Sequence, residues 1–318
     1  MTQQGQHIAV IGAGLMGHGI ALTFARAGHQ VSVSDPMADM LASCPARIAE
    51  SLTLLGADAK EVSNALGRVR LAKDMADAVS DADVVFEAAP EKLELKQKIF
   101  ANIETHAPDD AILASNTSVI QISKIMGGLK GRHRALGTHW WNPPHMIPLV
   151  EVVKTEWTDP ALAQRMFDLL AKAGKTPAMV EKDVPGFIGN RLQHALWREA
   201  ISLVENGICD AETVDNVVKA SFGRRLAVLG PLENADLVGL ELTQDIHKQV
   251  LFDLEDSGAP SPYLQQMRDA GRGGMSEGAG LRDWSQGDLE KTKARVAEHL
   301  RKLEDILPNQ SKLWEEQR

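Results

Sequence analysis

The chain is poor in cysteine and in aromatic residues, and it lacks any long apolar run. Its two cysteines, Cys44 and Cys209, lie far apart in the sequence, which excludes a disulfide-rich scaffold and favours a reducing compartment, the cytoplasm. No apolar stretch approaches the roughly 20 residues that a membrane-spanning helix requires, so we expect no membrane partner. The short polar start, Met1 to His7, is unlike a signal peptide.

Basic residues are also outnumbered, with 34 Lys and Arg against 43 Asp and Glu and a formal net charge of −9. Binding to a phosphate backbone requires clustered positive charge, so we expect no nucleic-acid partner. The ten histidines are not spaced with cysteine or aspartate as metal ligands usually are, so we predict no metal site. What remains is an ordinary globular composition over 318 residues, a length that suggests about two domains.

Short apolar runs alternate with helical patterns through the first half of the chain. The first run ends in glycine and is followed by helical spacing over residues 16–27. Strands separated by helices imply right-handed βαβ units and a parallel sheet that is covered on both faces. The expected strands are residues 8–11, 30–34, 83–86, 111–114, 135–137 and 149–153.

The pattern changes after Pro185, where strand-like runs give way to helical spacing. Residues 271–280 contain five glycines and are expected to form a loop. We therefore predict an α/β fold class, with a Rossmann-type, mostly parallel sheet domain over residues 1–185 and an all-helical C-terminal domain over residues 186–318. The expected helical segments are residues 187–206, 211–221, 232–254 and 290–306, the last within a solvated, charge-rich tail from 288 to 318.

The first strand is followed directly by the string Gly12-Ala13-Gly14-Leu15-Met16-Gly17, a G-x-G-x-x-G pattern that opens a helix. In a dinucleotide-binding βαβ unit, Gly12 permits the tight turn, Gly14 lets the backbone approach a pyrophosphate, and Gly17 allows close packing of helix on strand. The helix N-terminus offers free N–H groups to the phosphates. Asp35 ends the second strand, where a carboxylate accepts hydrogen bonds from ribose hydroxyls and repels a 2′-phosphate. We therefore expect these residues to bind NAD rather than NADP.

Polar residues follow two later strands, at the edge where open α/β sheets bind their ligands. Ser115-Asn116-Thr117-Ser118 closes one strand, and His139 closes another. The Asn142-Pro143-Pro144 corner suggests a chain reversal that would bring Glu151 back beside His139. A histidine with a carboxylate partner is an acid–base unit suited to neutral pH. Either residue alone is common in proteins, but the combination at this edge indicates catalysis.

These residues carry a resemblance to a known family. The chain resembles the L-3-hydroxyacyl-CoA dehydrogenase family over essentially its whole length, through several ordered motifs rather than one. The matching strings are Gly12 to Gly17, Glu87-Ala88-Ala89-Pro90-Glu91 with Lys96, Ser115 to Ser118, His139 to Glu151, Pro185-Gly186-Phe187-Ile188-Gly189-Asn190-Arg191, and Gly230-Pro231-Leu232-Glu233 with Asp236 and Gly239.

The resemblance implies a dehydrogenase in which His139 takes the proton of a substrate hydroxyl while a hydride passes to nicotinamide. Glu151 would orient the imidazole and stabilise its charged form. Ser118 and Asn190 would hold the reacting oxygen. These roles agree with the acid–base unit inferred from the residues themselves.

The same resemblance implies further cofactor contacts and a partner. The positions of Glu91 and Lys96 line the ribose side of the cofactor in the family, and Asn116 joins them among the expected NAD contacts. The helical domain of the family usually forms a dimer interface, which implies that this chain forms a homodimer.

Departures from the family pattern concern the substrate. Members that bind CoA carry lysines in the helical segment after the second strand, whereas this chain has no lysine before Lys60. The loop over residues 222–231 is longer than in the acyl-CoA enzymes. It resembles the branch of the family that does not use CoA, which includes L-gulonate 3-dehydrogenase and lambda-crystallin. Arg225 matches an arginine of that loop, and a guanidinium can clamp a free carboxylate with two hydrogen bonds.

Two tryptophans follow the expected catalytic histidine. Trp140 and Trp141 could narrow the pocket, stack on a ring or face a cation, or they could belong to the core or an interface. Trp141 and Asn142 join Ser118 and Arg225 as candidate substrate contacts. Carnitine dehydrogenase and a pyridine-carboxylate dehydrogenase of vitamin B6 breakdown resemble the same pattern.

Three functions are therefore compatible with the sequence. We favour a dehydrogenase of a small, non-thioester hydroxy acid. The first alternative is a 3-hydroxyacyl-CoA dehydrogenase, which the missing lysines disfavour. The second is a catalytically silent structural protein of the crystallin type, against which the complete set of Ser118, His139, Glu151 and Asn190 speaks.

Overall fold

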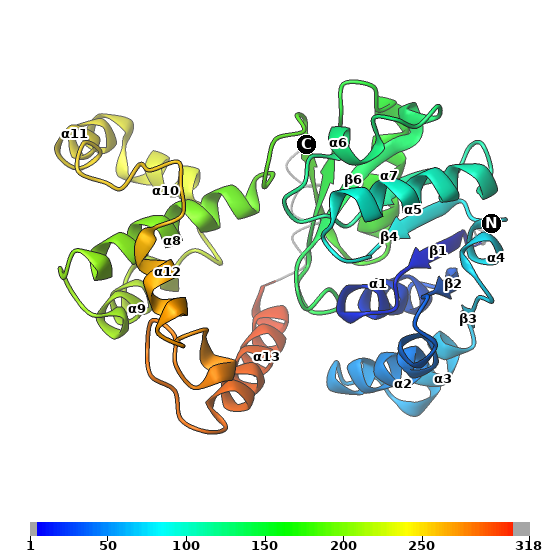
Figure 1. Cartoon of the computed structure of the whole chain (residues 1–318), viewed down its shortest axis with the longest axis horizontal. Coiled ribbons are helices and arrows are strands. Elements are labelled where there is room, and N and C mark those ends of the chain that lie inside the picture. Colours follow the sequence, from blue (N-terminus) through cyan, green and yellow to red (C-terminus); the bar gives the residue numbers. More distant parts are fainter. Residues whose placement is uncertain (1–4, 308–318) are drawn as a thin grey trace. The chain divides into compact units, whose positions relative to one another are not determined.

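The computed structural model describes residues 5–307, which form two compact units (Figure 1). The first unit contains the chain up to Arg191 together with the chain from Leu300, and the second unit is Leu192–His299. The first unit is built on one sheet and the second is helical. The predicted fold class, a sheet domain followed by helices, is confirmed.

The sheet of the first unit has eight strands in the order β3-β2-β1-β4-β5-β6-β7-β8. Neighbouring strands are parallel except β6 and β7, which are antiparallel. The order 3-2-1-4-5-6 is that of a dinucleotide-binding Rossmann sheet, whose ligands bind at the carboxyl ends of the strands. The strands are β1 His7–Ile11, β2 Gln30–Ser34, β3 Val69–Leu71, β4 Val84–Glu87, β5 Ile112–Ser115, β6 Ala135–Trp140, β7 Leu149–Val153 and β8 Thr176–Val180.

Helices cover both faces of this sheet. They are α1 Leu15–Arg26, α2 Ala38–Leu54, α3 Ala59–Leu66, α4 Met75–Val79, α5 Leu93–His106, α6 Ile122–Met126 and α7 Pro160–Lys172, with a 3-10 turn at Arg132–Arg134. Ile8 and Val10 of β1 pack in a core with α1, α2 and α7, whereas Ala9 and Ile11 pack in a second core with α4, α5 and α6. Because successive residues of a strand point to opposite faces, this nearly continuous apolar run fills two cores at once.

Both edge strands lack the patterns from which strands are predicted. β3 is only three residues long, and two of them are exposed, so it has neither length nor alternation. β8 contains Pro177, which has no N–H to donate and is tolerated only at a sheet edge. The sequence therefore predicts six of these strands and misses the two at the edges.

The second unit consists of helices α9 to α12 with most of α8 and α13. The bounds are α8 Gly189–Glu205, α9 Ala211–Ala220, α10 Pro231–Val238, α11 Leu240–Val250, α12 Pro262–Asp269 and α13 Asp288–Ile306, with 3-10 turns at Phe222–Arg224 and Met275–Glu277. The helix expected over 232–254 is two helices, because Gly239 adopts φ 98°, outside the helical region. The part of the expected tail helix over residues 308–318 lies outside the described residues.

The second unit has no apolar core of its own. Within Leu192–His299, all of which the structure describes, no hydrophobic side chain is buried. Many large ones are exposed instead, among them Leu237, Leu240 and Phe252, the last with 81% of its surface accessible. The first turn of α8 belongs to the first unit, so the two compact units divide slightly after the change of pattern at Pro185.

Some features are missing from the described chain. No helix within residues 5–307 has both the length and the apolarity needed to cross a membrane. In the same residues, no group of three or more His, Cys, Asp and Glu side chains could hold a metal ion. Both cysteines are free thiols, and burial raises the pKa of the Cys44 thiol to about 11.

Candidate active site at the carboxyl edge of the sheet

The glycine string forms a tight turn between β1 and α1. Gly12 has φ 104°, and a Cβ there would lie 2.6 Å from the carbonyl oxygen of Ala88. A Cβ on Gly17 would lie 1.7 Å from the carbonyl oxygen of Gly12, so only glycine lets the helix pack this closely. A Cβ on Gly14, in contrast, would meet no atom within 4 Å apart from its chain neighbours and the backbone of its own helix, so there is open space beside the turn.

This open space fits a dinucleotide. No side chain of the described residues caps the start of α1, so its first N–H groups are available to a phosphate. Leu15 is 61% exposed at the same end of the helix, and Met16 is partly buried against the core. Asp35 lies beside the turn, where its two carboxylate oxygens accept hydrogen bonds from Ala13 N at 2.7 Å and Met37 N at 2.8 Å.

Arg47 supports the turn from the other side, and sequence reasoning missed it. Its guanidinium donates hydrogen bonds to the carbonyl oxygens of Ala13 and Met40. The Ala13 residue is therefore held by its N–H on Asp35 and by its carbonyl on Arg47. No local motif signals this contact, because Arg47 lies 34 residues from Ala13 in the chain.

His139 and Glu151 are paired across the antiparallel strands β6 and β7. The two residues are directly opposite in the register, and His139 Nδ1 lies 2.7 Å from Glu151 Oε2. Both side chains are buried, with 3% and 1% of their surface exposed. The predicted chain reversal is confirmed, although β6 continues to Trp140, so His139 lies inside the strand rather than after it.

The second oxygen of Glu151 binds the start of α8. Glu151 Oε1 accepts hydrogen bonds from Ile188 N at 2.8 Å and Gly189 N at 3.1 Å. Burial acts to raise the pKa of Glu151, but the bond to His139 and these two N–H groups together hold the pKa below its ordinary value. Glu151 is therefore an anion at neutral pH, which fixes the orientation of the imidazole beside it.

Aromatic rings surround the imidazole of His139. Trp141 and Phe187 lie with their ring centroids 5.2 Å and 5.6 Å from that of His139. Trp141 also packs on Gly189, where a Cβ would lie 2.4 Å from its ring. Trp140 has a different role, because it is 2% exposed and packs in the core of the sheet domain. Of the two tryptophans, only Trp141 belongs to the site.

Ser118 is held in place through its backbone. The Asn190 amide donates a hydrogen bond to the Ser118 carbonyl oxygen at 2.8 Å. Glu91 Oε1 accepts hydrogen bonds from Thr117 Oγ1, Ser118 N and Val119 N at 2.5 Å, 3.0 Å and 3.2 Å. Burial acts to raise the pKa of Glu91, but these hydrogen bonds and the nearby charge of Lys96 hold the pKa below its ordinary value.

Lys96 lies behind Glu91 and is completely buried. Its ammonium contacts Glu87 Oε1 at 2.7 Å and Glu91 Oε2 at 3.4 Å. Ser115 Oγ donates to the other oxygen of Glu87 at 2.6 Å. The sequence assigns Glu87 no role of its own, although its position at the end of the buried strand β4 is a signal for one. The structure thus places Lys96 in a buried network that supports Glu91 and the Ser118 loop.

The remaining predicted residues are Asn116, Asn142 and Arg225. Asn116 uses its side-chain oxygen to accept a hydrogen bond from Trp140 N at 3.0 Å, which ties the ends of β5 and β6 together. Asn142 is exposed at the corner after β6, where its peptide bond to Pro143 is cis. Arg225 is exposed in the second unit, next to the 3-10 turn Phe222–Arg224.

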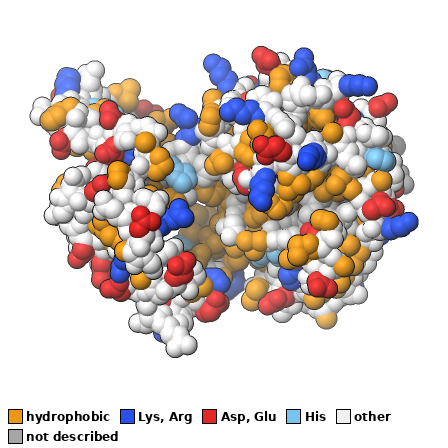
Figure 2. All heavy atoms as spheres, in the orientation of Figure 1, with side chains coloured by type: hydrophobic (Ala, Val, Ile, Leu, Met, Phe, Trp, Pro, Cys, Tyr) orange, Lys and Arg blue, Asp and Glu red, His pale blue; other side chains and the backbone are white. Residues whose placement is uncertain are grey.

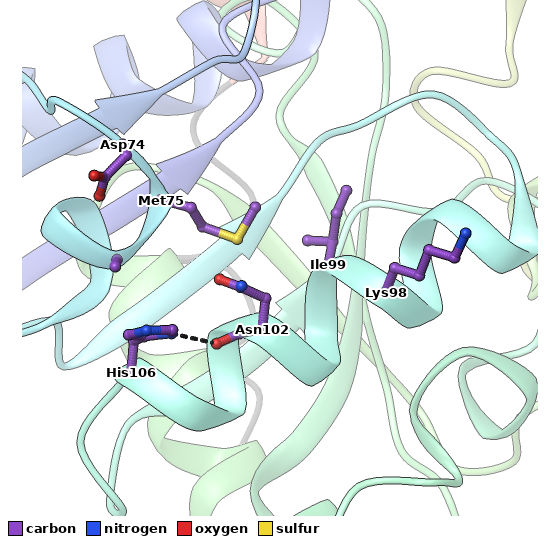
Figure 3. Close-up of a pocket in the computed structure, with 7 residues that line it drawn as sticks. Asp74, Met75, Lys98, Ile99, Asn102 and His106 are labelled. Carbon is purple, nitrogen blue, oxygen red and sulfur yellow. Dashed lines mark hydrogen bonds between the residues drawn. The ribbon is translucent and has the colours of Figure 1, made fainter.

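A separate surface depression lies between α4 and α5 (Figure 3). Met75 of α4 and Ile99 of α5 are among the residues that line it. Figure 3 also shows Asn102 beside His106, whose Nδ1 lies 2.9 Å from the Asn102 carbonyl oxygen. It shares no residue with the His139 site.

Two apolar side chains are exposed beside the His139 site. They are Val119, which follows Ser118, and Ile188, which lies two residues before Asn190, and each is about half accessible.

Comparison with known proteins agrees with this geometry. The family model described as 3-hydroxyacyl-CoA dehydrogenase, NAD binding domain, matches residues 7–184, and the model described as 3-hydroxyacyl-CoA dehydrogenase, C-terminal domain, matches residues 186–284. The chain is 36% identical to 5-formyl-3-hydroxy-2-methylpyridine 4-carboxylate 5-dehydrogenase of Mesorhizobium japonicum over 94% of this chain and 96% of the relative. A solved structure of an enzyme of that name, described as an NAD+ dependent dismutase, aligns with TM-score 0.87 and 34% identity over 95% of this chain and 98% of its own.

Relatives named for other substrates have similar sequence identity to this chain. L-carnitine dehydrogenase of Nocardiopsis dassonvillei is 34% identical over 74% of this chain and 71% of the relative. 3-hydroxybutyryl-CoA dehydrogenase of Mycobacterium tuberculosis is 36% identical over 88% of this chain and 99% of the relative. The two family models together span both the sheet domain and most of the helical one. The chain therefore belongs to the 3-hydroxyacyl-CoA dehydrogenase family and is an NAD-dependent oxidoreductase.

Proposed function

We propose that the protein oxidises the hydroxyl group of a small, carboxylate-bearing substrate, with His139 and Glu151 as the acid–base pair. The observation that carries this proposal is the buried contact of 2.7 Å between His139 Nδ1 and Glu151 Oε2. The two residues lie on β6 and β7, in the same sheet whose first strand leads into the glycine turn. A protein without catalytic activity would have no need to bury an ionised carboxylate beside a histidine, because burying a charge is unfavourable unless it is paired and hydrogen-bonded. This argues against the silent, crystallin-like alternative.

The proposed proton transfer follows from the hydrogen bonds of the imidazole. Because Nδ1 of His139 donates to Glu151, Nε2 carries the free lone pair and can accept the substrate's hydroxyl proton. The carboxylate then stabilises the imidazolium that forms, and in the reverse direction the imidazolium returns the proton. Bound NAD supplies the acceptor for the hydride that leaves the same carbon.

Ser118 and Asn190 are proposed to hold the reacting oxygen. Ser118 is an exposed residue, and the Asn190 amide is anchored on the Ser118 carbonyl, so the two side chains are held beside each other. Glu91 and Lys96 support this pair from behind. The proposed NAD contacts are the glycine turn, where Gly12 shapes the backbone and Gly14, Leu15, Met16 and Gly17 present N–H groups, together with Asp35, Glu91 and Asn116. Lys96, which is completely buried, is proposed to act on this side of the cofactor only through Glu91.

A free carboxylic acid is the proposed substrate class, rather than a CoA thioester. The chain has no lysine before Lys60 to meet the phosphates of CoA, and Arg225 is an exposed cation available to a carboxylate. Trp141 and Asn142 are the other proposed substrate contacts. Trp141 Nε1 is buried without a hydrogen-bond partner among the described residues, and a substrate oxygen could accept a hydrogen bond from it. The thioester alternative is favoured by one observation, the 36% identity to a 3-hydroxybutyryl-CoA dehydrogenase.

A substrate panel tests this proposal. NAD reduction would be compared for gulonate, carnitine, 3-hydroxybutyrate, aromatic hydroxymethyl acids and 3-hydroxybutyryl-CoA. We expect at least one free acid to exceed the thioester in kcat/KM. Replacing Arg225 by methionine should raise the KM for that acid by roughly 10- to 100-fold, because a hydrogen bond between charged groups contributes about 1.5–3 kcal/mol.

Arg224→Met is the matched control, since it removes another exposed arginine from the neighbouring position. It should leave the KM unchanged. A clear preference for the thioester would overturn the free-acid proposal and leave the dehydrogenase assignment intact. Equal effects of the two arginine substitutions would remove Arg225 as the anchor.

We also propose that the protein is a homodimer formed through its helical unit. Hydrophobic side chains are visible on the surface of this unit in Figure 2, in agreement with the absence of any buried one within Leu192–His299. A domain cannot be stable with so much apolar surface in water, because burial contributes about 25 cal/mol per Å². A second copy of the same unit would supply the missing core, as obligate dimers do.

Charge substitutions in α10 and α11 test this interface. The parent protein should have twice the 34.5 kDa mass of one chain in light scattering after gel filtration. The double variant Leu237→Glu/Leu240→Glu should lose the dimer or fail to stay soluble, because it buries two charges in an apolar contact. Leu54→Glu, an equally exposed leucine of the first unit, should remain dimeric. A parent protein that is monomeric at micromolar concentration would refute the proposal.

We propose that residues 1–185 bind NAD and that residues 186–318 contribute substrate contacts and the dimer interface. We also propose a cytoplasmic location, which the two free thiols support, because unpaired cysteines are usual in a reducing compartment.

A further inference from the structure

The chain enters α8 through a backbone turn in an unfavourable conformation. Phe187 has φ 53°, the one positive value of a non-glycine residue within residues 5–307. Gly186 before it has φ 73°, which glycine adopts without strain. A side chain at positive φ is disfavoured by contact between Cβ and the backbone, most of all for a bulky residue. Such an outlier persists only where the surrounding structure holds it, often at a functional site.

This turn holds both members of the acid–base pair. The N–H groups that follow Phe187 belong to Ile188 and Gly189, and both donate to Glu151 Oε1. The aromatic side chain of Phe187 is 1% exposed and contacts the imidazole of His139, with 5.6 Å between ring centroids and 51° between ring planes. One dihedral angle therefore sets the direction of two hydrogen bonds to Glu151 and the position of a ring against His139.

We infer that Phe187 is a positioning residue for the reaction, held in strain so that its ring and the two following N–H groups fix the His139–Glu151 pair from one side. This inference rests on the proposed role of that pair. A turn made only to start a helix would need no ring and would be more stable with glycine, which has no Cβ to strain. Burying a phenylalanine there at positive φ, in contact with His139, is explained if the ring restricts the imidazole to one orientation.

Two substitutions separate the ring from the strain. Phe187→Leu keeps a Cβ and fills apolar space but removes the flat ring, whereas Phe187→Gly removes both. We expect kcat to fall about tenfold in the leucine variant and about 100-fold in the glycine variant, because small misplacements of reacting groups have effects of this size. The KM for NAD should stay within about twofold, since the glycine turn is untouched.

A spectroscopic measurement reports the geometry without turnover. The Nδ1 proton of His139, in a short hydrogen bond to a carboxylate, should appear strongly downfield in the proton NMR spectrum of the parent protein. It should broaden or shift in both Phe187 variants. The pH dependence of kcat should shift in the same variants, because the imidazole would no longer be held against Glu151.

Phe100→Leu is the matched control for lost packing. Phe100 is a completely buried phenylalanine of α5 outside the site, so its substitution should lower the Tm and leave kcat, its pH profile and the downfield proton unchanged. The inference is overturned if Phe187→Leu keeps the parent kcat and NMR signal, or if it behaves like Phe100→Leu. Failure of the proposed function would look different, since His139 variants themselves would then retain turnover.

Discussion

Replacing His139 by alanine is expected to lower kcat by about 10³-fold, because general acid–base catalysis contributes roughly 10²- to 10⁴-fold. In the described part of the site, no second histidine is paired with a carboxylate and could act as the base instead. NADH binding should be unchanged, since the glycine turn and Asp35 are separate from this side chain. The measurement is steady-state turnover with the best acid of the substrate panel, alongside a fluorescence titration with NADH.

His106→Ala is the control for this experiment. His106 is an exposed histidine at the end of α5, and its Nδ1 lies 2.9 Å from the carbonyl oxygen of Asn102 in the same helix. Its removal should leave kcat and NADH affinity unchanged. Retained turnover in His139→Ala would show that the base is another residue. Loss of both turnover and NADH binding would instead point to a folding defect.

Replacing Glu151 by glutamine is expected to lower kcat by about 10²- to 10³-fold, because the tautomer of the imidazole depends on its hydrogen-bond partner. An amide N–H₂ facing Nδ1 favours the tautomer with the proton on Nε2, which then has no lone pair for the substrate. A neutral amide also fails to stabilise the imidazolium. The KM for NAD should change little, and the loss should appear in kcat.

The same substitution should change how stability depends on pH. The pKa of Glu151 is held below its ordinary value of 4.5 in the folded protein. A carboxyl group with a lowered folded pKa contributes stability above its unfolded pKa, and this contribution disappears as the pH falls below about 4.5 through the lowered value. The parent protein should therefore lose stability in this range, and Glu151→Gln should start from a lower Tm and lose less. Thermal melts between pH 7 and pH 3.5 measure this difference.

Asp183→Asn provides a matched control for the carboxylate. Asp183 accepts hydrogen bonds from Ile122 N and Ser123 N at the start of α6, as Glu151 does at α8, but no hydrogen bond joins it to His139 in the described chain. Its substitution should lower the Tm without a comparable loss of kcat. A similar kcat loss in both variants would mean that Glu151 acts only by stabilising the fold.

The fold class and the cofactor could be predicted because they depend on local patterns. Apolar runs such as residues 8–11 and the glycine string recur in every dinucleotide-binding unit, since a parallel sheet and a phosphate-binding turn require them. The pairing of His139 with Glu151 was also predictable, because the Asn142-Pro143-Pro144 corner between the two strands indicates that the chain turns back there. The edge strands β3 and β8 were not, because one is too short and the other contains proline.

The sequence by itself determined the succession of a sheet domain and a helical one, the family, the use of NAD and the adjacency of His139 and Glu151, all of which follow from periodicity or from recognisable motifs. Only the tertiary structure decided that Lys96 lies buried against Glu87, that Glu151 binds the start of α8 from 37 residues away, and that Phe187 contacts His139 in a strained turn. These contacts join segments that are distant in the chain. Their formation depends on how the sheet, its helices and the loops pack, and no repeating pattern in the sequence records that packing.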